Sequence, residues 1–342
     1  MIFTNQFDFH LPADLIAQHP VFPRDRCRLM VIDRKSQTTG HQIFSDLGRF
    51  LHKGDLLIFN DSRVIPARFY TVKNPTGGRV EILYLHRNRE LWVCCLNHSR
   101  SVRVGTILSL PENQRISWQV MEREQAWWFL QPSFSIEEEK EIFSLYGHTP
   151  TPPYIKTPGI RLEDYQTVYA RYDGSVAAPT AGLHFTQSFI EKLQGDGMGV
   201  ASLTLHVGPG TFFPVKTQTI EEHRMHSERY ELNQITAETI QKIKKRGGRV
   251  VAVGTTVVRV LESIFQRLGK IGEAEGETDI FIYPGFQFQV IDAMITNFHT
   301  PRSTLFMLVC AFGGTDLMKK AYIEAIDRRY RFYSFGDATL IV

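Results

Sequence analysis

The stretch that decides the fold is Arg249-Val250-Val251-Ala252-Val253-Gly254-Thr255-Thr256, which continues into a longer apolar segment over residues 257–268. A short valine-rich run that ends at a glycine turn is typical of a buried strand. The longer segment after the turn has the length of a helix. A strand that passes through a turn into a helix is the repeating unit of α/β proteins. We therefore predict a strand over 249–253 and a helix over 257–268.

The rest of the C-terminal half alternates between strand and helix patterns in the same way. Ser188 and Glu191 have the spacing of a capping box at the start of one of these helices. Such alternation predicts an open α/β core. The predicted strands cover residues 174–178, 200–207, 279–282, 292–297, 305–310 and 338–342. The predicted helices cover residues 188–193, 235–246 and 316–329.

The sequence pattern changes at Arg63. Short β-type runs alternate with turn clusters up to about residue 130, which is typical of a small barrel or sandwich. A helical segment over 135–146 and a proline-rich connector over 148–153 follow. We therefore predict an α/β catalytic domain made of residues 1–62 and 151–342. Residues 63–150 are predicted to be an inserted β-barrel domain.

Composition limits the class of protein. The chain has 342 residues, 43% of them hydrophobic and 22% charged, with a net charge of +3. It holds no apolar run long enough to span a membrane, and residues 1–8 lack the pattern of a secretory signal. Its four cysteines form no C-x-x-C pair, so neither a zinc ribbon nor a thioredoxin motif is supported. We expect a cytoplasmic protein.

Three predicted strand ends carry histidines beside Gly, Pro or Thr turns. They are His184, His206 and His299. A single histidine in such a place is more often structural than catalytic. Three of them favour a shared site, since open α/β folds bind ligands at strand ends and imidazole exchanges protons near neutral pH.

Two glycine turns follow predicted strands, one at residues 208–211 and one at 254–256. Amides exposed where the second turn opens a helix form a site for an anion such as a carboxylate. The alternative is that Thr255 or Thr256 only caps the helix. The sequence contains neither a P-loop nor a dinucleotide-binding fingerprint.

The segment from His223 to Tyr230 is rich in ionisable groups. His223 and His226 have a spacing that a metal pair could use, but no further ligand motif completes the set. We interpret this segment as a polar loop that faces substrate, and we predict no metal site.

Positive charge concentrates between residues 63 and 110, a segment that contains eight basic residues and only two acidic ones. Basic side chains on a small β domain can follow a phosphate backbone, and aromatic side chains there could stack on bases. The alternative is an ordinary solvated surface. The predicted RNA-binding residues are Arg68, Lys73, Arg79, Arg87, Arg89, Arg100 and Arg103.

Several motifs together resemble the S-adenosylmethionine:tRNA ribosyltransferase-isomerase family of queuosine synthesis. The similarity covers nearly the whole chain and is weakest over residues 86–131. The motifs that carry it are residues 8–12, 15–20, 24–25, 60–68, 174–186, 206–212, 223–228, 296–299, 301–305 and 330–338.

The resemblance implies an α/β domain with an inserted β-barrel. It also implies a reaction in which the ribosyl part of S-adenosylmethionine is transferred to 7-aminomethyl-7-deazaguanine at the tRNA wobble position and isomerised. The product is epoxyqueuosine, and adenine and methionine leave. S-adenosylmethionine is then a consumed substrate, no other cofactor is implied, and the family is usually monomeric, with tRNA as the partner and no role for a membrane.

This chemistry suggests roles for particular residues, as a hypothesis. The candidate catalytic residues are His184, His206, His299, Asp61 and Asp337. The turn at 254–256 is a candidate for the methionyl carboxylate, and Phe212 and Phe298 for the adenine or the sulfonium. The candidate substrate-binding residues are Arg63, Thr180, Gly182, Gly208, Gly210, Thr211, Phe212, His226, Gly254, Thr255, Thr256, Asn297, Phe298 and Arg302.

Three other functions remain open at this point. A metal-dependent hydrolase would use some of the twelve histidines, and a non-catalytic RNA-binding protein would use the basic segment. A methyltransferase should have a glycine-rich loop after its first strand, and no such loop occurs early in the chain.

Overall fold

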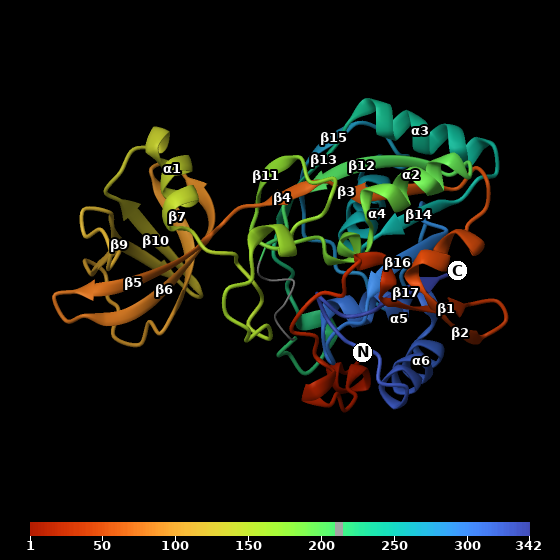
Figure 1. Ribbon diagram of the computed structural model, residues 1–342, viewed down its shortest axis with the longest axis horizontal. Helices are drawn as coiled ribbons and strands as arrows, with labels where there is room; N and C mark the ends of the chain where they lie inside the picture. The colour runs from red at the N-terminus through yellow and green to blue at the C-terminus, as the bar shows by residue number, and fades with distance from the viewer. Residues whose placement is uncertain (209–214) are drawn as a thin grey trace.

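The computed structural model describes residues 1–208 and 215–342. A nine-stranded sheet forms the larger part of the molecule, in the order β15-β13-β12-β3-β14-β16-β17-β1-β2. A closed six-stranded barrel stands at the other end of the long axis, and both chain termini lie in the sheet-containing part (Figure 1). The predicted fold class, an open α/β core with a small β-barrel, is confirmed.

The centre of the sheet is parallel, because β12, β3, β14 and β16 pair side by side in one direction. β17 runs antiparallel to β16 and parallel to β1, while β13, β15 and β2 add antiparallel edges. The bounds of these strands are β1 Arg28–Asp33, β2 Thr38–Ile43, β3 Leu56–Asn60, β12 Gly199–Leu205, β13 Glu228–Leu232, β14 Val250–Val253, β15 Ala274–Thr278, β16 Ala293–Asn297 and β17 Ala338–Ile341.

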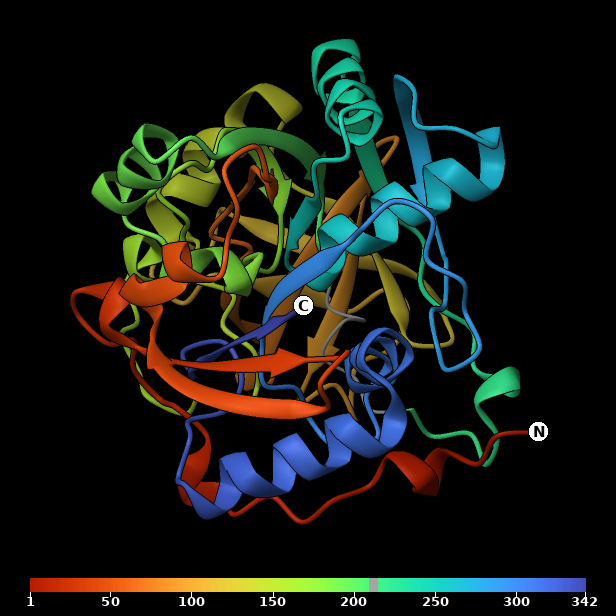
Figure 2. The same cartoon turned by 90° about the vertical axis from the view of Figure 1, so that its right-hand side faces the viewer.

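Alternate residues of each central strand enter two separate cores, one on each face of the sheet. Leu56 and Ile58 of β3 pack with four helices on one face, which are α3 Gln234–Lys245, α4 Thr255–Leu268, α5 Thr304–Gly313 and α6 Thr315–Asp327. Leu57 and Phe59 face α2 Gln187–Gly195 and the short helix Phe44–Arg49. Figure 2 shows this layered part from the side away from the barrel.

The barrel contains the six strands that were expected from the alternation of β-type runs and turn clusters in the sequence. They are β5 Arg68–Asn74, β6 Gly78–Asn88, β7 Leu91–Asn97, β8 Ile107–Ser109, β9 Ser117–Glu124 and β10 Trp127–Pro132. Phe69, Trp92 and Trp118 fill its interior. Helix α1 Ile136–Tyr146 follows, with a capping box formed by Ser135 and Glu138. The exact domain boundaries, at 62/63 and 150/151, stay a prediction.

A parallel two-stranded ribbon joins the two parts. It pairs β4 Ser62–Val64 with β11 Tyr172–Ser175. β4 comes just before the barrel in the chain, and β11 comes after the barrel. Arg68 and His148 also form a β-bridge where the chain enters and leaves the barrel. The two crossings of the chain are therefore tied together by backbone hydrogen bonds.

The first quoted stretch folds as predicted, with one difference at the helix start. β14 ends at Val253 and α4 begins at Thr255, so Gly254 is the N-cap residue and neither threonine is. Gly254 has φ +98° and ψ 151°, a conformation that is essentially restricted to glycine. The chain therefore passes through a single residue from the end of β14 into α4 at the edge of the sheet.

Four local predictions were wrong. Ser188 does not cap α2, because Thr186 is the N-cap residue and accepts from the backbone amide of Phe189. Residues 305–310, expected as a strand, lie in α5, because Ser303 caps a helix there and a short apolar run fits either structure. The strand expected at 279–282 lies earlier, at β15. Part of the segment read as a polar loop is β13, whose Glu228, Tyr230 and Leu232 point inward.

Among residues 1–208 and 215–342, no helix is both long enough and apolar enough to cross a membrane.

Candidate active site at the sheet edge

The carboxyl ends of the four parallel strands bring several predicted site residues to one edge of the sheet. β3 ends just before Asp61, β12 just before His206, β14 just before Gly254 and β16 at Asn297. Because β17 runs the opposite way, its amino end delivers Asp337 to the same edge, where Ala338 is paired with Asn297. Ligands of open α/β sheets bind at this edge.

A small cavity opens among these strand ends, and we call it the strand-end cavity. Its volume is about 50 Å³, the space of one or two water molecules. It therefore accommodates one chemical group of a ligand in this conformation and not a whole nucleoside. The predicted site residues that line it are Thr180, Gly254, Thr255, Thr256, Asn297, Phe298 and His299.

A larger cavity lies between the sheet edge and the barrel, and we call it the barrel-facing cavity. Its volume is about 780 Å³, and Val207 lines both it and the strand-end cavity. Its walls come from the two parts of the molecule, with Tyr84 and Trp127 from the barrel strands. The predicted catalytic and substrate-binding residues in its lining are His206, Gly208 and His226, and the predicted RNA-binding residue Arg87 lines it as well.

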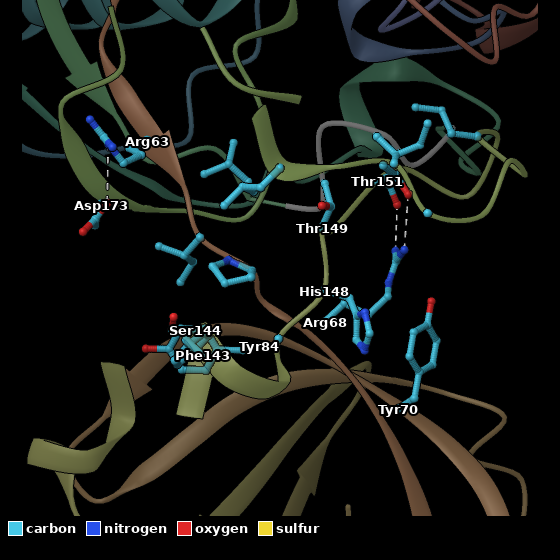
Figure 3. Close-up of a pocket in the computed structure, with 18 of the residues that line it drawn as sticks. Arg63, Arg68, Tyr70, Tyr84, Phe143, Ser144, His148, Thr149, Thr151 and Asp173 are labelled. Atoms are coloured by element: carbon cyan, nitrogen blue, oxygen red, sulfur yellow. Dashed lines mark hydrogen bonds and ion pairs between the residues drawn. The ribbon is translucent and has the colours of Figure 1, made fainter. Parts of the chain in front are cut away.

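A third cavity, of about 1170 Å³, lies beside the segments that connect barrel and sheet. Figure 3 shows this linker cavity with Arg63 and Asp173 on one side and Tyr70, His148 and Arg68 on the other. The rings of Tyr70 and His148 lie 4.9 Å apart, and half of Tyr70 is exposed.

His184 is a buried residue with both ring nitrogens engaged. Nε2 lies 3.0 Å from Nδ2 of Asn297, and Nδ1 lies 3.2 Å from Sγ of Cys27. Burial, followed by the positive charges of Arg331 and Arg24, lowers the pKa of His184 to about 3. The ring is neutral at physiological pH and holds Asn297 in place.

His299 is buried as well, but it lines the strand-end cavity. Its Nε2 lies 3.0 Å from the hydroxyl of Thr296, and its backbone amide donates to the Tyr322 hydroxyl. Burial lowers the pKa of His299 to about 3, so this imidazole is also neutral near pH 7.

His206 is the histidine of the three that lines the barrel-facing cavity. Burial and the charge of Arg229 lower its pKa, and its buried Nδ1 has no hydrogen-bond partner among residues 1–208 and 215–342. A Cβ on Gly174 would lie 3.0 Å from that atom, which accounts for a glycine there. The three imidazoles gather at one sheet edge, but they do not line one common cavity.

The two aspartates at this edge are held by hydrogen bonds. Asp61 accepts from the hydroxyls of Ser202 and Thr204, both at 2.7 Å. Asp337 accepts from the backbone amides of Arg28 and Arg331. Neither side chain lines any of the three cavities. We therefore interpret both as groups that hold the chain in place around the site.

The sequence did not single out one ion pair that borders the barrel-facing cavity. Glu228 forms a buried ion pair with Arg259 of α4 and accepts from the backbone amide of Gly208 at 2.8 Å. The only sequence signal was the density of charge around His226, because Arg259 lies within an apolar helix. This pair fixes the chain just after His206.

Other predicted substrate-binding residues have structural tasks in this conformation. A Cβ on Gly182 would clash with the hydroxyl of Tyr169, so this glycine allows close packing. Phe298 is fully buried among Tyr322, Tyr330 and Phe332, with little ring surface left for adenine. Arg302 pairs with Asp8 near the N-terminus. Gly210, Thr211 and Phe212 lie outside the described residues.

The predicted RNA-binding residues fall into two groups. Arg68 is paired with Glu81, and Arg87 with Glu139, so both are tied within the protein. Lys73 donates a hydrogen bond to Ser101. The exposed residues of the predicted set are Arg79, Arg89, Arg100 and Arg103.

The described part of the chain holds no cluster of three or more His, Cys, Asp or Glu side chains suited to a metal ion. His223 packs on Phe281 and His226 on Trp127 of the barrel, so the two rings have separate neighbours.

Comparison with known proteins places this arrangement in a family. A family model described as "Queuosine biosynthesis protein" matches residues 4–341. The S-adenosylmethionine:tRNA ribosyltransferase-isomerase of Thermotoga petrophila is 50% identical over 341 residues, which is 99% of each chain. The protein of that name from Pelobacter propionicus is 47% identical over 349 residues, again 99% of each chain.

A solved structure is similar over the same length. The crystal structure of an S-adenosylmethionine tRNA ribosyltransferase from Thermotoga maritima has 40% sequence identity and a TM-score of 0.58, and the match covers 98% of this chain and 100% of that one. The resemblance drawn from the motifs is confirmed. The chain belongs to the queuosine biosynthesis protein family.

Proposed function

We propose that this protein transfers the ribosyl part of S-adenosylmethionine to 7-aminomethyl-7-deazaguanine at the wobble position of tRNA and isomerises it, which yields epoxyqueuosine-tRNA, adenine and methionine. The observation that carries the proposal is the full-length family match, over residues 4–341. The two cavities at the sheet edge are our candidates for the substrate-binding space of this reaction.

The barrel-facing cavity is our candidate for the reacting centre. It is large enough for a nucleoside, and it lies between the sheet edge and the basic barrel. His206 lines it as a neutral imidazole near pH 7, since its pKa is lowered. A neutral imidazole can take the 5′ proton that the adjacent sulfonium acidifies. Glu228 and Arg259 hold the backbone beside it.

The strand-end cavity is our candidate for one end of S-adenosylmethionine. Thr255 and Thr256, in the first turn of α4, line it, and the helix dipole there favours a carboxylate. Phe298 lines the same cavity of about 50 Å³. A space so small takes only one end of the substrate. When that end is the amino acid, its carboxylate lies at the α4 turn. Phe298 is fully buried, so we withdraw its stacking role.

The barrel is our candidate for the contact with tRNA. Its exposed cations include Arg79, Arg89, Arg100 and Arg103, which suit a phosphate backbone. The target base must leave the anticodon-loop stack to present its amine in the barrel-facing cavity. In this proposal the protein acts in the cytoplasm as a monomer, and S-adenosylmethionine is consumed without a further cofactor.

Product analysis tests the function directly. Purified protein is incubated with S-adenosylmethionine and tRNA that carries 7-aminomethyl-7-deazaguanine, and the products are identified by liquid chromatography and mass spectrometry. We expect adenine, methionine and modified tRNA in equal amounts, and no S-adenosylhomocysteine. S-adenosylhomocysteine as the main product would indicate a methyltransferase and overturn the proposal.

A further inference from the structure

The amide of Asn297 has one possible orientation, because its three partners fix it. The backbone carbonyl of Tyr333 can only accept a hydrogen bond, so the atom 3.1 Å from it is the amide nitrogen Nδ2. The oxygen Oδ1 then faces Thr180, whose hydroxyl donates to it at 3.0 Å.

This orientation decides the tautomer of His184. Nδ2 of Asn297 also lies 3.0 Å from Nε2 of His184 and must donate to it, so Nε2 carries no proton. The proton of the neutral ring is then on Nδ1 and points to Sγ of Cys27, 3.2 Å away. Burial keeps the thiol protonated by raising its pKa and keeps the ring neutral by lowering its own.

The chain Cys27–His184–Asn297–Thr180 therefore runs in one direction. The single hydrogen of the Thr180 hydroxyl is committed to Asn297, and both Nδ2 hydrogens of Asn297 are committed to His184 and Tyr333. Thr180 and Asn297 both line the strand-end cavity. They can offer a ligand only oxygen lone pairs.

We propose that Thr180 and Asn297 form an acceptor pair that binds an amine of S-adenosylmethionine, and that His184 is a positioning residue that fixes both as acceptors. This rests on the proposed function. Two adjacent acceptors favour a group with at least two N–H hydrogens, because a ribose hydroxyl has only one. The substrate has two such groups, the ammonium of its amino-acid end and the exocyclic amine of adenine, and the small cavity has room for one of them.

The test measures kcat/KM, at saturating tRNA, for S-adenosylmethionine and for two analogues. One analogue has hydrogen in place of the α-amino group, and the other has hydrogen in place of the adenine amine. We expect the wild type to prefer S-adenosylmethionine over one analogue by about 5- to 150-fold, since the acceptors stay unpaired with that analogue. The disfavoured analogue identifies which amine is bound.

Variants then connect the preference to the acceptor pair. Thr180→Val should lower kcat/KM for S-adenosylmethionine about 5-fold or more and leave the disfavoured analogue nearly unchanged, so the preference shrinks. Thr180→Ser, which keeps the hydroxyl, should retain it. His184→Leu should reduce the preference as Thr180→Val does, and His184→Gln, which keeps an acceptor for Asn297, should restore much of it.

Two results would overturn the inference. One is an equal loss for S-adenosylmethionine and both analogues in Thr180→Val and His184→Leu, which is the result of a merely structural role. The other is a ¹⁵N NMR spectrum of histidine-labelled protein in which His184 is protonated on Nε2. The NMR result does not depend on turnover, while absence of adenine release by the wild type would count against the proposed function alone.

Discussion

His206 differs from the other two histidines of the sheet edge because its ring faces a cavity that is large enough for a ligand. His184 is held between Asn297 and Cys27, and His299 is bonded to Thr296. His206 faces the cavity that is large enough for a nucleoside. At the scale of single residues, burial and hydrogen bonds therefore separate a candidate base from candidate positioning groups, although the three look alike in the sequence.

His206→Gln should slow the reaction strongly while leaving the fold intact. General base catalysis contributes about 10²- to 10⁴-fold, so single-turnover adenine release should fall by that order. His52→Gln is the matched control, because His52 is an exposed histidine in a turn before β3. A rate within a factor of about three of the wild type, well below the range expected for a base, would remove His206 from the catalytic set.

The buried neutral histidines predict a pH dependence of stability. The folded pKa of His299 is about 3, and that of an unfolded histidine is about 6.5. The unfolded chain binds the proton first, so the contribution of His299 is complete above pH 6.5 and is lost as the pH falls toward 3.

The measurement is urea unfolding of the wild type and His299→Gln between pH 7 and pH 4. Glutamine does not titrate, so the wild type should lose about 1.4 kcal/mol more than the variant per pH unit in this window. Parallel stability curves for the two proteins would show that His299 is not neutral and buried in solution.

At the scale of elements, the sequence predicted those strands and helices whose formation depends on a local pattern of residues. The six barrel strands follow from short β-type runs between turns, and β14, α4 and α6 from apolar runs with clear ends. The errors lie where pattern is ambiguous. Residues 305–310 are apolar enough for either structure, and β13 carries two exposed charges, Arg229 and Glu231, that disguised it.

The site was predictable to a similar depth. Strand ends located His206, Gly254 and Asn297, since the chain must turn there. The partition of the histidines between cavities depends on side-chain contacts between distant segments, such as Cys27 with His184, which are 157 positions apart. No spacing rule in one sequence encodes such a contact.

Gly254→Ala should destabilise the protein by about 1–3 kcal/mol, because the glycine-only backbone conformation at the start of α4 would be strained. Space is not the cause, since a Cβ there would meet its nearest atom at 3.6 Å. Gly195→Ala is the control, because Gly195 has ordinary backbone angles and no atom within 4 Å of a Cβ. Urea unfolding measures both, and equal stabilities would contradict the strained turn.

At the scale of the whole molecule, the barrel and the sheet divide the work. The sheet edge supplies the polar groups of the candidate site, and the barrel closes one side of the 780 Å³ cavity with Tyr84 and Trp127. The contact of Trp127 with His226, 5.1 Å between ring centroids, connects the two parts beside that cavity. A substrate as large as tRNA could then touch the barrel while one nucleotide reaches the sheet edge.

The four exposed arginines of the predicted RNA-binding set should govern tRNA affinity. A variant with alanine at Arg79, Arg89, Arg100 and Arg103 should bind tRNA more weakly, and each lost phosphate contact should lower the slope of log affinity against log salt by about 0.7–0.9. Filter binding over a range of salt concentrations measures this.

The control variant removes four cations from the sheet-containing part, at Lys245, Arg246, Lys270 and Lys320, which are all exposed. It changes the net charge by the same amount. Equal affinities and slopes for the two variants would show that the barrel has no special role in binding.

The place of β17 has a consequence for how the protein is made. β17 lies between β16 and β1, so the N-terminal strands β1 and β2 join the sheet only through residues 338–341. While the ribosome is still translating the chain, the barrel can close from its own contiguous residues, but the first strands must wait for nearly the last ones. β1 and β2 can pair with each other as a hairpin, but β1 lacks its second neighbour until residues 338–341 are made, and until then its open edge is accessible to chaperones.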